Sequence, residues 1–194
     1  TNDKKEGDVP YGTIVIISES PLKFGLLYAG TDDGNIQVSK DDGYTWELVS
    51  NNLPKLLKGL YVSRVVASQF KEGRVYATLN GYRNDNFTPW LFVSDNYGKT
   101  WNDLSGNLPF EPLNVIKEDP EFEDILYAGS DNGLYVSFNR GISFRSFGKN
   151  LPSAPVHDIA MQKEANEIVI GTHGRSIYIA SLKDIHKIYK DSIK

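Results

Sequence analysis

An eight-residue motif that occurs three times is the feature that most constrains how this 194-residue chain folds. Each copy reads Ser-x-Asp/Asn-x-Gly-x-Thr/Ser followed by Trp or Phe, and an Asn-Leu-Pro tripeptide follows each copy at the same distance. The copies span residues 39–46, 94–101 and 137–144, and the tripeptides span residues 52–54, 107–109 and 150–152. Tandem repetition at this spacing is typical of folds in which each repeat forms one small unit that packs against its neighbours.

A second motif keeps the same register along the chain. Residues 27–34 (LYAGTDDG) match residues 126–133 (LYAGSDNG), and residues 169–174 (VIGTHG) form a shorter version. Gly, Asp and Asn turn residues separate the short apolar runs around these motifs, which predicts four short strands per repeat. In the first repeat the strands are expected at about 13–18, 26–31, 35–39 and 45–49. Four antiparallel strands in a repeat of about 40 to 50 residues correspond to one blade of a β-propeller.

The sequence therefore predicts an all-β fold of three full four-stranded antiparallel propeller blades and a partial, three-stranded fourth. We expect a linker at residues 1–10, the propeller segment at 11–182 and an exit segment at 183–194. The blades are expected at about 11–54, 60–109, 112–152 and 155–182. Four blades lie at the bottom of the known range, so we expect this segment to be part of a larger propeller. Its open blade faces would then be covered by the remainder of the same propeller or by another chain.

The recurring motif has the chemistry of a tight hairpin turn. The Asp or Asn side chain accepts hydrogen bonds from backbone N–H groups further along the turn, and the glycine supplies a positive φ. The final aromatic residue is expected to fold under the turn as a buried plug. Two copies carry Asn in place of Asp, and an amide cannot act as a general acid or base. We therefore interpret the motif as structural, at Ser39, Asp41, Gly43, Thr45, Trp46, Ser94, Asn96, Gly98, Thr100, Trp101, Ser137, Asn139, Gly141, Ser143 and Phe144.

Composition and missing motifs limit the kinds of partner. A formal net charge of −4 argues against a dedicated nucleic-acid-binding protein, and no apolar run approaches the length of a membrane helix. Neither a nucleic-acid partner nor membrane insertion is therefore expected. The chain has no cysteine and no zinc, phosphate-loop or nucleophile-elbow motif, so we expect no metal, no cofactor and no catalytic residue. The acidic run at residues 118–124 lacks the spacing of a calcium loop and is expected to be a solvated turn.

The three motifs resemble the Asp boxes of the BNR-repeat superfamily, which includes sialidases, xyloglucanase-type glycoside hydrolases and sortilin. More narrowly, the chain resembles large bacterial BNR-repeat proteins described as sortilin-like or glycosyl hydrolase-like, from about residue 11 to residue 185. The strings that carry this resemblance lie at residues 17–22, 29–34, 62–64, 80–87, 155–158 and 171–176. The resemblance implies the C-terminal half of a larger propeller in an extracellular, periplasmic or cell-surface protein, although the first residues show no signal peptide.

Candidate ligand contacts come from the face that carries the strand 2–3 loops and the crossings between blades, where propellers usually bind. The insertion at residues 80–90 mixes aromatic, cationic, acidic and amide side chains, which suits a peptide or a glycan. The alternative is a hairpin folded over its own blade with Arg83 and Asp85 paired. The turn after residue 171 could bind an anionic group or be held by local hydrogen bonds. The candidate ligand-binding residues are Tyr82, Arg83, Asp85, Asn86, Trp90, His173 and Arg175.

Catalysis has little support in the sequence. A glycoside hydrolase needs two carboxylates about 5 to 9.5 Å apart, and Asp32, Asp33 and Asp131 on the same face lie in repeated turn strings. We therefore interpret the chain as a non-catalytic binding or scaffold module of a larger exported protein, which recognises a protein, peptide or glycan. One alternative is half of a xyloglucanase-like or sialidase-like glycoside hydrolase. A second alternative is a sortilin-like peptide-binding receptor domain.

Overall fold

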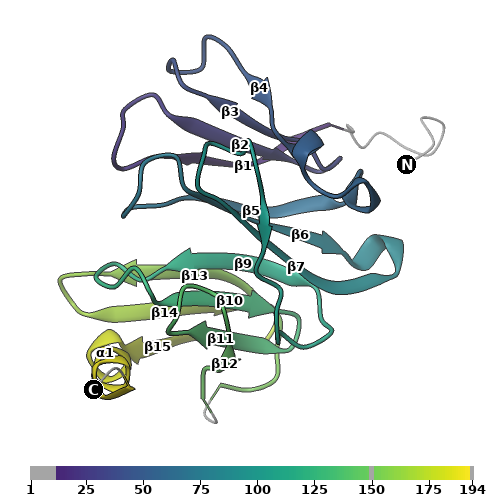
Figure 1. The fold of residues 1–194 in the computed structure, drawn as a ribbon. Helices are drawn as coiled ribbons and strands as arrows, with labels where there is room; N and C mark the ends of the chain where they lie inside the picture. Colours follow the sequence, from purple (N-terminus) through teal and green to yellow (C-terminus); the bar gives the residue numbers. More distant parts are fainter. Residues whose placement is uncertain (1–11, 149–150, 193–194) are drawn as a thin grey trace.

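The computed structural model describes residues 12–148 and 151–192. The linker expected at residues 1–10 and the first residue of the third Asn-Leu-Pro tripeptide lie outside the described residues. The described residues form four antiparallel sheets that lie side by side, followed by a C-terminal helix (Figure 1). The predicted all-β architecture, with three four-stranded blades and a three-stranded fourth, is confirmed.

In each sheet the strands are hydrogen-bonded in chain order, with the first strand at one edge and the last strand at the other. Blade 1 contains β1 (Ile14–Glu19), β2 (Leu27–Thr31), β3 (Ile36–Ser39) and β4 (Glu47–Leu48). Blade 2 contains β5 (Tyr61–Ala67), β6 (Val75–Gly81), β7 (Asn86–Ser94) and β8 (Asn102–Asp103). Blade 3 contains β9 (Leu113–Glu118), β10 (Leu126–Ser130), β11 (Gly133–Ser137) and β12 (Arg145–Ser146). Blade 4 contains β13 (Val156–Gln162), β14 (Glu167–Thr172) and β15 (Ile177–Ser181), and α1 (Leu182–Ser192) follows it.

The blades radiate from a common axis, because the first strands β1, β5, β9 and β13 contact one another in sequence. Glycines set the spacing between neighbouring blades. A Cβ atom at Gly30 would lie 2.6 Å from Cγ1 of Val62 in blade 2. A Cβ atom at Gly129 would lie 2.8 Å from Cγ1 of Val156 in blade 4. A valine of the following blade therefore occupies the space that a side chain at the glycine would need.

The repeated motif closes the hairpin between the third and fourth strands of each blade. In blade 1, Asp41 accepts hydrogen bonds from the backbone N–H and the hydroxyl of Thr45 and from the hydroxyl of Ser39. Asn96 and Asn139 each accept the backbone N–H at the corresponding position, 2.9 Å away in both blades. Hydrogen bonds from Thr45 hold the pKa of Asp41 below its ordinary value. The acceptor oxygens of these side chains are thus used within the turn.

The aromatic residue of the motif packs against the preceding blade. The indole N–H of Trp101 donates to the backbone carbonyl of Val49 in blade 1, and Phe144 is buried against blade 2. Trp46, at the same position in blade 1, is 40% exposed. The expectation of a buried plug is therefore wrong for Trp46, because no described sheet lies on that side of blade 1.

The expectation of a solvated acidic turn at residues 118–124 is wrong for its first two carboxylates. Glu118 is buried and accepts hydrogen bonds from Ser68 and from the backbone of Gln69, and its burial raises its pKa. Asp119 is also buried, and it accepts hydrogen bonds from the hydroxyl of Tyr127 and pairs with His186 of α1. The acidic run is consequently a docking point for blade 2 and for the helix.

The exit segment forms α1, which packs beneath blades 3 and 4 instead of leaving the fold. Its first N–H donates to the carbonyl of Asn166 in the β13–β14 turn, and Tyr189 donates to Asp124 in the β9–β10 turn. In the part of the chain that the structure describes, no helix is both long and apolar enough to cross a membrane.

Candidate binding cleft at the propeller axis

Each blade has a β-bulge at the same place in its first strand. The register of the first two strands shifts between Ile14 and Ile16, between Val62 and Arg64, and between Val156 and Asp158, and the β9–β10 pair shifts at the equivalent position. The extra residue in each bulge is Val15, Ser63, Asn114 or His157. A bulge turns its strand and re-aims a side chain. All four of these residues line one cleft at the axis.

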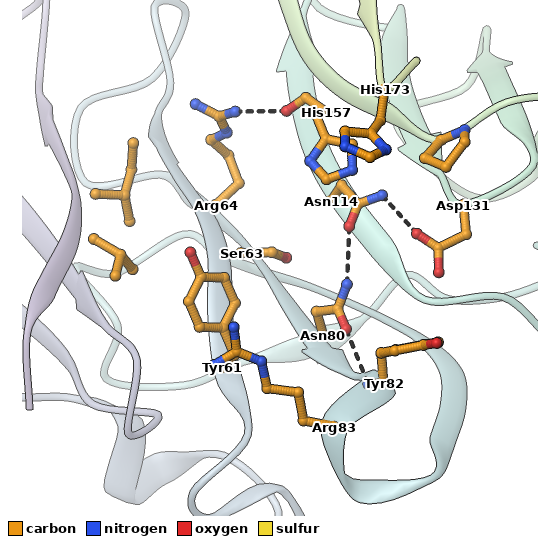
Figure 2. Close-up of a pocket in the computed structure, with 13 residues that line it drawn as sticks. Tyr61, Ser63, Arg64, Asn80, Tyr82, Arg83, Asn114, Asp131, His157 and His173 are labelled. Carbon is orange, nitrogen blue, oxygen red and sulfur yellow. Dashed lines mark hydrogen bonds between the residues drawn. The ribbon is translucent and has the colours of Figure 1, made fainter. Parts of the chain in front are cut away.

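The cleft has a volume of about 710 Å³ and is open to solvent (Figure 2). All four blades contribute to its wall. Its lining residues are Val15, Ile16, Tyr61, Ser63, Arg64, Asn80, Tyr82, Arg83, Asn114, Asp131, Pro155, His157 and His173. The volume lies within the range of ordinary ligand sites, about 300 to 1,000 Å³.

A chain of hydrogen bonds fixes one wall of the cleft, from blade 2 to blade 3 (Figure 2). The backbone N–H of Tyr82 donates to Asn80, and the amide of Asn80 donates to Asn114 over 2.8 Å. Asn114 in turn donates to the carboxylate of Asp131 over 2.9 Å. Asp131 is therefore held by an amide at the end of a fixed polar network.

Basic side chains also line the cleft. The guanidinium of Arg64 reaches from β5 to β13, where it donates to the carbonyl of His157 over 3.0 Å and to Asp158 over 2.9 Å. Its Nε–H is buried and has no hydrogen-bond partner among the described residues. The imidazole rings of His157 and His173 lie 5.5 Å apart between centroids. The side chains of these two histidines and of Arg83 form no hydrogen bond or ion pair with other described residues and are exposed to the cleft.

Three of the seven sequence-predicted ligand residues line this cleft, namely Tyr82, Arg83 and His173. The other four do not line it. Asp85 lies at the tip of the insertion with a positive φ of 53°, and Asn86 accepts hydrogen bonds from the N–H of Thr88 and from the indole of Trp90. Trp90 packs on the core beside Phe92, and Arg175 is exposed outside the cleft.

The proposed internal pairing within the insertion is not observed. No ion pair joins Arg83 and Asp85, both of which are described. Instead, aromatic contacts shape the loop, because Tyr82 meets Phe87 edge-on at 6.0 Å between ring centroids. This arrangement leaves the guanidinium of Arg83 available to the cleft.

Several cleft residues were missed by sequence reasoning, above all Ser63, Arg64 and Asn114. They lie in strands whose sequence pattern is that of ordinary half-buried strands. The bulges that expose them are a property of the backbone, and the signal that could have found them is the alignment of first strands between repeats. That alignment places one polar residue in three of the four blades at the bulge position.

Comparison with known proteins agrees with the geometry. The chain matches no known protein-family profile and no curated protein sequence. Among solved structures it is similar to an ancestral GH74 enzyme, with a TM-score of 0.68 and 14% identity over 88% of this chain. The chain has a β-propeller fold. A GH74 xyloglucanase from Xanthomonas campestris gives a TM-score of 0.64 at 12% identity over 88% of this chain, and YCF48 bound to D1 peptide gives 0.63 at 13% over 88%.

These similarities cover only part of the other proteins. The propeller segment spans 23% of the ancestral enzyme, 29% of the xyloglucanase and 51% of YCF48. At such low identities the likeness shows a shared fold and does not carry an activity with it, because one fold hosts many functions.

Proposed function

We propose that this chain is a non-catalytic binding module of a larger exported protein, and that its ligand binds in the axial cleft. The observation that carries the proposal is that every blade aims a bulge residue into one cleft, which is rimmed by the β6–β7 insertion and the β14–β15 turn. Loops and strand ends on a rigid scaffold are the usual place for recognition.

The composition of the cleft favours binding over hydrolysis. Hydrolysis of a glycosidic bond needs two carboxylates that flank the bond, and Asp131 is the one carboxylate among the described lining residues. Asp131 is also engaged by Asn114. Two arginines and two histidines also line the cleft, so the cleft suits a ligand with an acidic or strongly hydrogen-bonding group.

The partner class is proposed to be a peptide or a protein segment, with a glycan as the alternative ligand. The similar structure of YCF48 is a complex with a peptide, and one similar GH74 enzyme is named a xyloglucanase. A part of a glycoside hydrolase therefore remains the second candidate, favoured by the fold shared with GH74 enzymes. A sortilin-like receptor is the form that the first candidate would take with a peptide ligand.

A binding screen with cleft variants tests the proposal. Peptide and glycan arrays are probed with the wild-type chain, with Arg83→Ala/His173→Ala and with Arg175→Ala. The double variant removes an exposed guanidinium and an exposed imidazole from the cleft, whereas Arg175→Ala removes an exposed guanidinium outside the cleft and serves as the control. We expect the double variant to lose at least about tenfold in affinity and the control to bind as wild type. Equal binding by all three chains would show that the cleft is not the site.

An assay of xyloglucan hydrolysis distinguishes the second candidate function, part of a glycoside hydrolase, from the binding module. Xyloglucan is incubated with the chain, and with Asp131→Asn, and the release of reducing ends is measured. A binding module is expected to release no reducing ends. Turnover that the Asp131→Asn variant loses would replace the binding proposal with a hydrolase.

A further inference from the structure

The crossing from blade 1 to blade 2 is longer than the two later crossings. Six residues (55–60) separate the first Asn-Leu-Pro tripeptide from β5, whereas three residues (110–112 and 153–155) separate the later tripeptides from β9 and β13. The longer crossing contains a short 3-10 helix, η2 (Lys55–Leu57), and then Gly59 with a positive φ of 86°. Insertions into one unit of a repeat fold often belong to a binding face.

This crossing lines a second pocket, which we call the blade 1–2 pocket. Its volume is about 510 Å³, and its walls come from the crossing, from the β2–β3 turn of blade 1 and from Leu79 of blade 2. It shares no lining residue with the axial cleft. All of these walls belong to two consecutive blades, so the pocket does not use the outer face of blade 1 or of blade 4.

The apolar part of the blade 1–2 pocket is aliphatic. Leu53, Leu57 and Leu79 are buried side chains that line it together with Pro54, and no described lining residue is aromatic. An aliphatic side chain gains free energy when it is buried against such atoms. A sugar would bring hydroxyl groups against them, which costs free energy where those groups lose their hydrogen bonds. The lining therefore favours an aliphatic peptide side chain over a sugar.

The charged side chains of the pocket favour an acidic partner. Lys55 and Lys58 are exposed, and neither forms an ion pair with another described residue. Asp33 is the one carboxylate among the described lining residues, and its oxygens accept hydrogen bonds from the hydroxyl of Thr31 and the amide of Asn35. The pocket thus has two available ammonium groups and one carboxylate that is already engaged, which is complementary to a negative charge.

We propose that the blade 1–2 pocket binds a peptide segment of a partner protein in which an aliphatic residue is adjacent to an acidic residue. The aliphatic side chain packs on the leucine and proline lining, and the carboxylate pairs with Lys55 and Lys58. Because the pocket and the axial cleft have no residue in common, this site does not depend on what the cleft binds.

A titration followed by nuclear magnetic resonance tests the proposal on the isotope-labelled chain. The probe is the capped peptide acetyl-Ser-Gly-Leu-Glu-Gly-Ser-amide, and two control peptides replace its Glu by Gln or its Leu by Ser. We expect the probe to shift the amide signals of residues 33–35 and 50–59, and each control peptide to bind about fivefold more weakly. Absence of these shifts at millimolar peptide, or equal binding of the three peptides, would overturn the proposal.

Two double variants locate the binding energy. Lys55→Ala/Lys58→Ala removes both pocket lysines, and Lys99→Ala/Lys163→Ala removes two exposed lysines from the β7–β8 and β13–β14 turns as the charge-matched control. We expect the pocket variant to bind the probe about fivefold more weakly and the control to bind as wild type. The double variant of the axial cleft should also bind this probe as wild type, which separates the two sites. Equal affinities of the pocket variant and its control would overturn the proposal.

Discussion

Three buried tyrosines occupy the same strand position in blades 1, 2 and 3, but their hydroxyl groups have different surroundings. The hydroxyl of Tyr127 donates to Asp119, whereas the hydroxyl of Tyr28 is buried and has no partner among the described residues. Burial raises the pKa of both phenols. We predict that Tyr28→Phe leaves the free energy of unfolding unchanged or raises it by up to about 1 kcal/mol, because an unpaired buried hydroxyl is removed.

Tyr127→Phe is the matched comparison, and it should lower the free energy of unfolding by about 1 to 2 kcal/mol because Asp119 loses a donor. Urea denaturation of the two variants measures both values. An equal loss for Tyr28→Phe would mean that its hydroxyl is hydrogen-bonded in solution.

The first turn motif predicts a specific response to acid. The lowered pKa of Asp41 means that the carboxylate stabilises the fold fully above the pKa of the unfolded chain, and that this contribution is lost as pH falls through the folded pKa. The window therefore lies below about pH 4. We predict that wild type has the higher Tm at pH 7 and that its difference from Asp41→Asn shrinks toward pH 2.

The reciprocal change serves as the control. Asn96→Asp should add the same acid dependence to the second motif, because Asn96 accepts the equivalent hydrogen bond from Thr100. Melting curves followed by circular dichroism at pH 2 to 7 measure the Tm difference between wild type and each variant. A difference between wild type and Asp41→Asn that does not change with pH would contradict the assignment.

At the residue scale, the hydrogen bonds within a turn could be predicted from the sequence, whereas the burial of a side chain could not. The turn partners of Asp41 follow from residue types at fixed offsets, because a turn closes within a few residues of itself. The environment of Trp46 depends on a neighbouring sheet, which no local pattern describes.

At the scale of elements, strands were predictable from apolar periodicity, but bulges and the helix contacts were not. A bulge shifts register by one residue without a required residue type, so Ser63 and Asn114 looked like ordinary strand residues. The sequence of the exit segment gave no indication that His186 would meet the buried Asp119, because these residues are far apart in the chain.

Helix α1 should stabilise blades 3 and 4 mainly through His186. His186 is buried, with Nε2 at 2.9 Å from Asp119 and Nδ1 at 3.5 Å from Glu121. We predict that His186→Ala lowers the free energy of unfolding by about 2 kcal/mol, because the buried carboxylate of Asp119 loses a hydrogen-bond partner. Lys187→Ala, on the exposed side of the same helix, should change it by less than about 0.5 kcal/mol. Similar losses in both variants, measured by urea denaturation, would show that the helix acts through its overall packing.

At the scale of the whole molecule, the cleft exists only because the blades assemble around an axis. Arg64 in blade 2 and Asp158 in blade 4 meet there, with a whole blade between them in sequence. The sequence pointed to one face through its loops, but it could not show which strand residues would converge on the axis. The insertion on that face contributes Tyr82 and Arg83 to the cleft, while binding there stays a prediction.

The number of neighbouring blades should also determine the local stability of each blade, since repeat units are stabilised by the interfaces that they share. Blades 2 and 3 have a described blade on both sides, whereas blades 1 and 4 have one. The second strands β2, β6, β10 and β14 give a fair comparison, because each is hydrogen-bonded on both edges. We predict that amides of β6 and β10 exchange with solvent about tenfold more slowly than those of β2 and β14 in the dilute chain.

Hydrogen exchange followed by mass spectrometry measures these rates. If β2 and β14 were as slow as β6 and β10 in the dilute chain, the exposed isoleucines of the two terminal blades would cost little stability, and the blades would be held by their own cores rather than by their neighbours.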